Sequence, residues 1–525
     1  MRLQQRSLDC APAPSGPSQP PYLRPGCGRS AVFTPSSTRL LRRLPLALLG
    51  LALLHLLMGA SIGLSVDEAH YLLYAAHPDW SYFDHPPLVG WVQWPLVASG
   101  APVWLLRALP GALWLLSAWG IFHVAIRLPG AKREAGLWAL AVFALAPVLH
   151  VLGIGLVPDT LLMALGIWTM ALTLHMVRQP GIADRRWWLL LGLALGLAGL
   201  SKYTAVLLAA PVVLCLLLRH GPGLLVHVRV WAALLLALLL VAPVFWWNAQ
   251  HGWISFQYQL QHGAGGRWEV LHVLQFVLVQ ALAYGPLLLA GCMASGVPQA
   301  WRWRGFFLIP FAVLAYMAGG GVSLPHWTAP AWVCLAPFAG LVLAQAWAGG
   351  RRRAIVALVL LQALICAALL GLTLAAGAPL MSRTLVVTPE GDNPFSDLFG
   401  WDAAGERARA LAAAHGLASV SVQNWTLASR IGWYAQPLPV HVLDTGMSQF
   451  VLWAGELPSG GDTLLVDVSR LSFTPPLGAQ GFAACTLLET LPVYHWGAPV
   501  ARFDFYDCRD WGGKPKPKAA VPGSR

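Results

Sequence analysis

Eleven apolar segments recur along residues 44–376, separated by short polar loops. Most of them approach the roughly 20 residues that a helix needs to cross a bilayer. We expect membrane-spanning helices at about 44–63, 103–126, 135–152, 160–177, 187–200, 204–218, 231–247, 270–290, 306–318, 328–347 and 354–376. The pattern therefore predicts a polytopic all-α membrane domain over residues 44–378.

The first 43 residues are rich in Pro, Ser and Arg and lack apolar periodicity, which predicts a disordered basic tail. A signal peptide is the alternative, because Leu44–Met58 is apolar. The tail is too long for the basic region of a signal peptide, and more apolar segments follow. We therefore expect an uncleaved first helix.

Basic residues occur mainly in alternate loops, on the same side of the membrane as the basic tail. They are Arg127, Lys132, Arg133, Arg178, Arg185, Arg186, Arg219, Arg229, Arg302, Arg304, Arg351, Arg352 and Arg353. Cytoplasmic loops carry such an excess, so the N-terminus is expected in the cytoplasm and, with eleven spans, the C-terminus outside. This placement explains the net charge of +12 without a nucleic-acid partner.

From Pro379 onward the composition is that of a soluble domain. Helices are expected at 401–415 and 426–434, and short strands at 417–423, 440–443, 463–468, 483–488 and 500–505. The pattern predicts a small α/β domain over 379–510 on the outer face, followed by a disordered tail over 511–525. In an oxidising compartment Cys485 and Cys508 could form a disulfide.

The first outer loop, residues 64–102, concentrates the ionisable groups of a chain in which only 11% of residues are charged. Within it, Ser65–Trp91 holds four carboxylates and three histidines among aromatic residues. Aromatic rings with polar edges favour the membrane–water interface, and ionisable groups there are candidates for function. We expect the chemistry in this stretch.

Asp67 and Glu68 directly follow the first apolar segment. A carboxylate that has lost solvation binds protons more tightly and can act as a general base. The alternative is that Ser65 and Asp67 cap a short interfacial helix over 68–76. Both interpretations can hold together.

Asp84 and His85 precede two prolines, which enforce an extended backbone. The pair could bind a metal or a phosphate, or it could form a turn with an Asp–His hydrogen bond. Asp159, after Pro158, could cap a helix or point into an outer cavity.

Lys202 lies in a loop on the outer side, where Lys is disfavoured. A bound phosphate would explain it, and snorkelling towards lipid is the alternative. His262 and Arg267 flank glycines that allow close approach of a ligand, although an ordinary loop is an equal interpretation. His326 could contact substrate or belong to an interfacial aromatic belt.

Several of these motifs, in this order, resemble bacterial glycosyltransferase family 39. The resemblance covers about residues 44–505 and rests on Asp67-Glu68, Tyr82-Phe83-Asp84-His85-Pro86-Pro87, Pro158-Asp159, Leu200-Ser201-Lys202-Tyr203-Thr204, Phe256-Gln257-Tyr258-Gln259-Leu260-Gln261-His262, His326-Trp327-Thr328-Ala329-Pro330-Ala331-Trp332 and Phe399-Gly400-Trp401. These proteins are membrane enzymes of the protein O-mannosyltransferase and aminoarabinose transferase superfamily, with the GT-C fold.

The resemblance implies a bacterial inner-membrane enzyme that takes a sugar from a polyprenyl-phosphate carrier at the outer face, with inversion. It implies that Asp67 is the candidate base, that Glu68 supports it, that Lys202 holds the carrier phosphate and that Asp159 is the acid of the second outer loop. The aminoarabinose branch has Glu-Lys where this chain has Asp84-His85. A divalent metal at Asp84, with His262, is a further implication, and no other cofactor is expected.

The acceptor is left open between a glycolipid such as lipid A, a polysaccharide and a protein. A transporter or flippase for lipid-linked glycans is one alternative function, but such carriers usually contain internal repeats and none is visible here. A non-catalytic subunit of envelope assembly is another alternative, in which Asp67 is dispensable.

Overall fold

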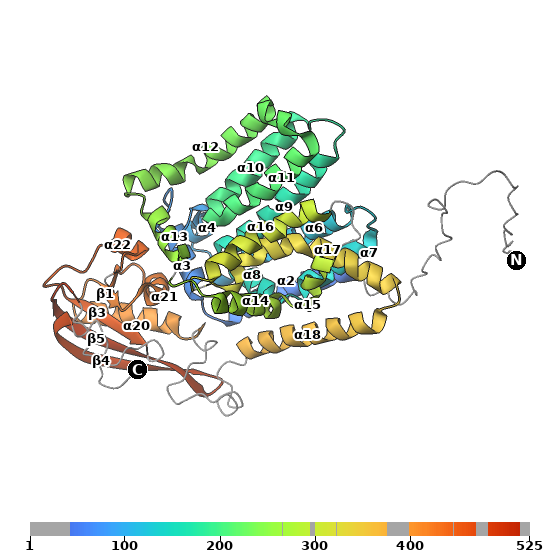
Figure 1. Cartoon of the computed structure of the whole chain (residues 1–525). Coiled ribbons are helices and arrows are strands. Elements are labelled where there is room, and N and C mark those ends of the chain that lie inside the picture. Colours follow the sequence, from blue (N-terminus) through green and yellow to red (C-terminus); the bar gives the residue numbers. More distant parts are fainter. Residues whose placement is uncertain are drawn as a thin grey trace, which may run out of the picture.

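The computed structural model describes residues 43–264, 266–293, 300–321, 323–374, 398–444, 446–468 and 481–514. The tails predicted to be disordered lie largely outside these residues. A bundle of helices forms one part, and a smaller sheet-containing domain covers one end of it (Figure 1).

All eleven predicted apolar segments fall on helices, and two additional helices form in the first outer loop. The long elements are α2 (Leu44–Ser61), α6 (Ala108–Ala125), α7 (Arg133–Ala144), α9 (Pro158–Arg178), α10 (Arg185–Ser201), α11 (Val206–His220), α12 (Val228–Gln250), α14 (Val270–Tyr284), α16 (Ala300–Ala318), α17 (Ala329–Ala348) and α18 (Arg352–Leu374), and the short helix α8 (Pro147–Ile154) lies between α7 and α9 in the chain. Shorter helices are α3 (Val66–Ala76), α4 (Leu88–Ala98), α5 (Val103–Leu106), α13 (Ile254–Ala264) and α15 (Pro286–Leu289), with 3-10 turns η1 (Tyr203–Ala205), η2 (Pro222–Val226), η3 (Ala290–Met293) and η4 (Pro325–Thr328).

The number of spans differs from the predicted eleven. Among the described residues, seven helices are long and apolar enough to cross a membrane, or nine if two bent helix pairs each count as one span. The pair α14 and α15–η3 is bent by 104°, because Gly285 adopts a φ of +77° and Pro286 follows it. The predicted span 270–290 is therefore a broken element.

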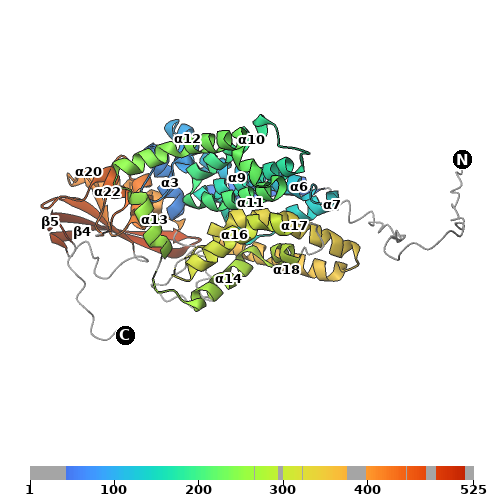
Figure 2. The ribbon, with the colours of Figure 1, turned by 45° about the horizontal axis from the view of Figure 1, so that its top comes forward.

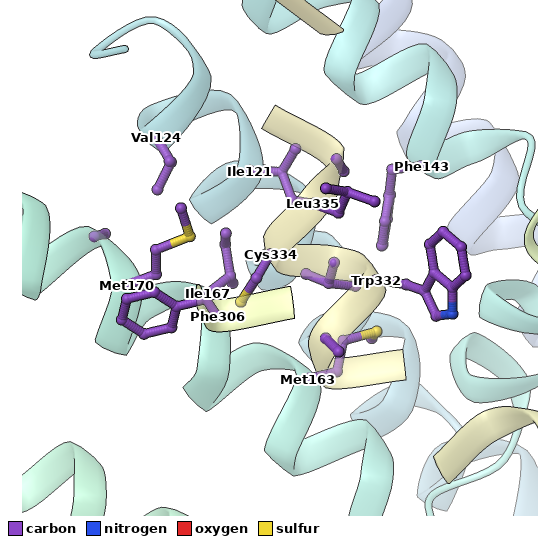
Figure 3. Close-up of a cluster of buried hydrophobic side chains, with 14 of the residues drawn as sticks. Ile121, Val124, Phe143, Met163, Ile167, Met170, Phe306, Trp332, Cys334 and Leu335 are labelled. Atoms are coloured by element: carbon purple, nitrogen blue, oxygen red, sulfur yellow. The ribbon is translucent and has the colours of Figure 1, made fainter. Parts of the chain in front are cut away.

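Helix α17 lies at the centre of the bundle and packs against α6, α7, α9 and α16 (Figure 2). Its residues from Ala329 to Leu341 are all buried. Gly340 allows the close approach to α7, since a Cβ there would overlap Ala135 and Ala139. Figure 3 shows the apolar contacts around it, which include Trp332 and Leu335. This buried core forms a rigid frame for the residues at the end of the bundle, where the candidate functional site described in the next section lies.

The described residues 398–514 form a small mixed sheet with three helices, as expected for an α/β region. Strand order is β2-β1-β3-β5-β4; β1 pairs in parallel with β2 and β3, and β5 pairs antiparallel with β3 and β4. The elements are α20 (Trp401–Ala414), β1 (Val420–Val422), α21 (Trp425–Tyr434), β2 (Val440–Val442), α22 (Gln449–Ala454), β3 (Thr463–Val468), β4 (Phe482–His495) and β5 (Ala498–Trp511).

The structure contains the disulfide between Cys485 and Cys508, which lie opposite each other on β4 and β5. Both strands run well beyond the predicted segments, and β5 ends at Trp511, the first residue of the region predicted as a disordered tail. The helix α21 packs against α3 of the first outer loop. The C-terminal domain thus reaches the stretch in which we expect the chemistry.

Candidate active site

Asp67 is placed by the capped start of α3. Ser65 and Glu68 form a capping box there, in which the Ser65 side chain accepts from the Glu68 amide and the Glu68 carboxylate accepts from the Ser65 amide. Asp67 follows in the first turn, and its side chain lines a cavity. Its carboxylate makes no hydrogen bond within the part of the chain that the structure describes. It is therefore available to a substrate.

The electrostatics of Asp67 suit a proton acceptor. Burial raises the pKa of its carboxyl above the ordinary value, although His326 and His70 act in the opposite direction. A carboxylate with a raised pKa takes a proton more readily than an exposed one does. Of the two adjacent acids, Asp67 has the environment of a base.

Glu68 has a different environment from the one expected. It was expected to support Asp67, but its carboxylate pairs with Arg107, with Nε–Oε1 at 2.7 Å and Nη2–Oε2 at 3.0 Å. Arg107 also donates to the carbonyls of Gly59, Ile62 and Gly63 at the end of α2. The pair joins α2, α3 and the start of α6, and Glu68 does not line the cavity. Glu68 therefore positions the helix that carries Asp67.

Asp84 is held by groups on α3. Its Oδ1 accepts a hydrogen bond from the Tyr74 hydroxyl and lies 3.3 Å from His70 Nε2, and Gln259 Nε2 donates to its backbone carbonyl at 2.6 Å. Burial opposes ionisation of Asp84, but His70, His85 and the Tyr74 hydroxyl together outweigh it and keep the pKa of Asp84 below the usual range. Asp84 is therefore an ionised partner of His70.

His85 lines the same cavity. Burial lowers its pKa to about 4, despite the opposing effect of Asp84. The ring is therefore neutral near pH 7, and in that state one ring nitrogen can donate and the other can accept. His85 can offer a hydrogen bond to a bound anion without adding a charge.

Lys202, at the end of α10, and Asp159, at the start of α9, form a buried ion pair. Nζ lies 2.8 Å from Oδ1 and 2.7 Å from Oδ2, and the two residues are 6% and 2% exposed. Asp159 sits in the first turn of α9, where the helix dipole favours an anion. His326 Nε2 lies 3.7 Å from Asp159 Oδ2, and the Trp327 ring faces Lys202 at 5.3 Å.

These groups converge on one cavity of about 260 Å³. It brings together six of the residues expected from the sequence, namely Asp67, Asp84, His85, Asp159, Lys202 and His326. It also contains residues that were not expected as site residues, although Thr204, Tyr258, Gln259 and Trp327 lie in the motifs quoted above; the others are Tyr71, Val157, Leu314, Met317, Leu324 and Trp425. Trp425 comes from the C-terminal domain, so the cavity lies where both parts of the molecule meet.

Besides Glu68, one expected residue lies away from this cavity, and the side chain of another is not among those that the structure describes. Arg267 is exposed and does not line it. His262 lies on α13, but its side chain falls outside the described residues.

The expected metal at Asp84 is not tested, because the side chain of His262, its second expected ligand, lies outside the described residues. The described part of the chain contains no group of three or more His, Cys, Asp or Glu that could hold an ion. The Asp84 oxygen that faces His70 also accepts the hydroxyl of Tyr74.

Comparisons with known proteins agree with these observations. The sequence model of the dolichyl-phosphate-mannose-protein mannosyltransferase family matches residues 84–247. Lipid A galacturonosyltransferase RgtD from Rhizobium johnstonii is 28% identical over 193 residues, 35% of this chain and 38% of that protein. The match thus spans well under half of the relative's length.

Two solved structures are similar in fold. ArnT from Cupriavidus metallidurans in the apo state matches with a TM-score of 0.56 and 16% identity, over 90% of this chain and 98% of that one. Arabinofuranosyltransferase AftD from Mycobacteria matches with a TM-score of 0.50 and 18% identity, over 88% of this chain and 41% of that one. Together the likenesses confirm the resemblance to family 39 and the GT-C fold.

Proposed function

Because this chain is a multi-span membrane protein of the GT-C type related to glycosyltransferase family 39, we propose that it is a glycosyltransferase. It moves a sugar from a polyprenyl-phosphate carrier to an acceptor at the outer face of the bacterial inner membrane. Asp67 removes the proton from the attacking group of the acceptor, and the anomeric carbon is inverted.

The observation that carries this proposal is the presence of an unpaired carboxylate and a buried cation in one cavity. Such a transfer needs a base on the acceptor side and a positive charge near the departing phosphate. Asp67 supplies the first and Lys202 the second. A lipid phosphate is already a leaving group, so neither a nucleotide nor a domain that binds one is required.

The donor phosphate is assigned to the Lys202 end of the cavity. The ammonium group has three protons, and the two contacts to Asp159 leave one for a phosphate oxygen. Asp159 keeps the cation charged and fixed, while the neutral His85 ring can donate a further hydrogen bond. Leu314, Met317 and Leu324 supply apolar surface for the start of a polyprenyl chain.

The acceptor is assigned to the side covered by the C-terminal domain. Trp425 begins α21, is 40% exposed and lines the cavity. Two contacts hold the helix that carries Trp425. Asn424 caps the start of α21, and Ser429 Oγ on the same helix lies 3.2 Å from His70 Nδ1 on α3. The acceptor is a glycolipid such as lipid A, a polysaccharide or a protein, and the relation to a lipid A galacturonosyltransferase favours the first.

The C-terminal domain is assigned to the periplasm and the N-terminus to the cytoplasm. The distribution of arginines supports this orientation. The disulfide between Cys485 and Cys508 supports it independently, because such bonds persist in oxidising compartments.

The test uses purified protein in proteoliposomes with a labelled polyprenyl-phosphate sugar and an acceptor extract from envelope membranes. We expect the label to become covalently attached to an acceptor with the wild type, and Asp67→Asn to lose this transfer. A flippase would move the intact labelled lipid between leaflets without forming a new bond, and that result would refute the proposal.

A further inference from the structure

A second polar cavity lies at the opposite end of the bundle from Asp67. It has a volume of about 520 Å³ and receives three arginines from three helices. Arg178 ends α9, Arg219 lies in the last turn of α11 and Arg302 lies in the first turn of α16. Helix α9 has 21 residues and is therefore about 30 Å long. Since Asp159 lies at its other end, the cavity is about one bilayer thickness from the active site.

The guanidinium groups differ in how they are held. Arg219 donates to the carbonyls of Val177 at 2.9 Å and Gln179 at 3.1 Å, which ties α11 to the end of α9. Arg178 makes no hydrogen bond or ion pair with the residues that the structure describes, and Arg127 is near enough to act on it electrostatically. The cluster therefore carries like charges that an anion would stabilise.

The rest of the wall is apolar. Leu174, Val177 and Trp303 lie beside the arginines, and no acidic residue lines the cavity within the described part of the chain. A soluble anion would use only the charged part of this wall. An amphiphile with a phosphate at the level of the guanidinium groups and apolar chains beside the helices would use both parts.

We propose that this cavity binds the phosphate group of an anionic phospholipid in the cytoplasmic leaflet. Basic cavities between membrane helices on the cytoplasmic side are suited to such headgroups, and each basic residue near the surface contributes to the attraction. A volume of several hundred Å³ is that of a ligand cavity. The proposal depends on the orientation given above and is independent of the transferase activity.

Binding is tested by native mass spectrometry of the detergent-purified full chain with phosphatidylglycerol or phosphatidylcholine. We expect the wild type to retain phosphatidylglycerol preferentially, and Arg178→Ala/Arg302→Ala to bind it at least about tenfold more weakly. The matched control is Arg185→Ala/Arg186→Ala, which removes two arginines on the same side of the membrane but outside the cavity. It should behave as the wild type.

Equal retention by the double variant and the wild type, or an equal loss in the control, would overturn the proposal. Displacement of the lipid by millimolar inorganic phosphate would also overturn it, since the occupant would then be a soluble anion. Thermal unfolding in phosphatidylcholine alone reports whether the double variant folds. If it does not, Arg178→Gln alone serves, because that side chain is exposed, and unchanged phosphatidylglycerol retention would refute the proposal.

Discussion

Lys202 Nζ lies within 2.8 Å of both carboxylate oxygens of Asp159, although the two residues are 43 positions apart. The cation that we assign to the donor phosphate is therefore already paired in the described structure. A buried charge needs such a partner, because removing one member leaves the other uncompensated in a low-dielectric site. The pair allows a charged ammonium group to exist in the buried cavity before substrate arrives.

This arrangement predicts different effects of Lys202 on stability and activity. Lys202→Gln should lower the free energy of unfolding by about 3–5 kcal/mol, because Asp159 is then a buried unpaired charge. The double variant Asp159→Asn/Lys202→Gln should regain most of that stability, while transfer stays lost in both. Thermal unfolding and transfer assays on the same preparations check this, and recovered activity in the double variant would refute the role of Lys202.

The raised pKa of Asp67 predicts the pH dependence of the reaction. A base must be ionised, so activity falls as the pH drops through the pKa of Asp67, which burial raises above the ordinary 3.8. The acid limb of kcat/KM should therefore lie at a higher pH than that of an exposed carboxylate. His85 has a pKa of about 4 and is therefore neutral at and above neutral pH. His85→Gln should therefore leave the shape of the pH profile of kcat/KM in that range unchanged. An acid limb at or below 3.8 in the wild type would contradict the assignment.

Trp425 should act on the acceptor and not on the donor. Trp425→Ala should raise the KM for the acceptor about tenfold, the effect of losing one well-packed aromatic contact. Slow transfer of the sugar to water should be unchanged, and Trp425→Phe should restore most of the acceptor affinity. Trp496→Ala is the control, because Trp496 is 70% exposed and does not line the cavity. An equal loss of transfer to water would show that Trp425 does not act through the acceptor.

The disulfide gives a direct check of the orientation. In intact cells Cys485 and Cys508 should resist alkylation until a reductant is added, because the C-terminal domain is assigned to the oxidising compartment. Replacing both by Ser should lower the stability of that domain by about 2–5 kcal/mol. Alkylation of both thiols without reduction would place the domain in the cytoplasm and contradict the topology.

The sequence predicted the helical membrane part and the α/β character of the C-terminal region. It also predicted six residues of the cavity, because ionisable groups are few in this apolar chain and several lie next to its apolar segments. The separation of Asp67 from Glu68 was not predicted, since it depends on Arg107, which lies 39 positions away from Glu68. Adjacent residues on a helix point in different directions, so only tertiary contacts show which of two acids faces the cavity.

The sequence pattern also contains partial signals for the face of α3 that lines the cavity and for the break between α14 and α15. Asp67, Tyr71 and Tyr74 are spaced by four and three residues, which puts them on one face of α3. The break before Pro286 was indicated by Gly285, although the apolar run across it favoured a single span. Trp425 could not be found in this way, because its place in the cavity depends on how the C-terminal domain docks on α3.

The most direct test of the central claim compares envelope glycolipids by mass spectrometry in a deletion strain complemented with wild type, Asp67→Asn or Asp79→Asn. Asp79 undergoes the same change in the same outer loop but does not line the cavity. We expect wild type and Asp79→Asn to restore a sugar-sized mass on the glycolipids. Asp67→Asn, present at equal levels in the membrane, should transfer the sugar about 10²–10⁴-fold more slowly and should not restore that mass. Equal restoration by Asp67→Asn would show that Asp67 is not the base and would contradict the proposed mechanism.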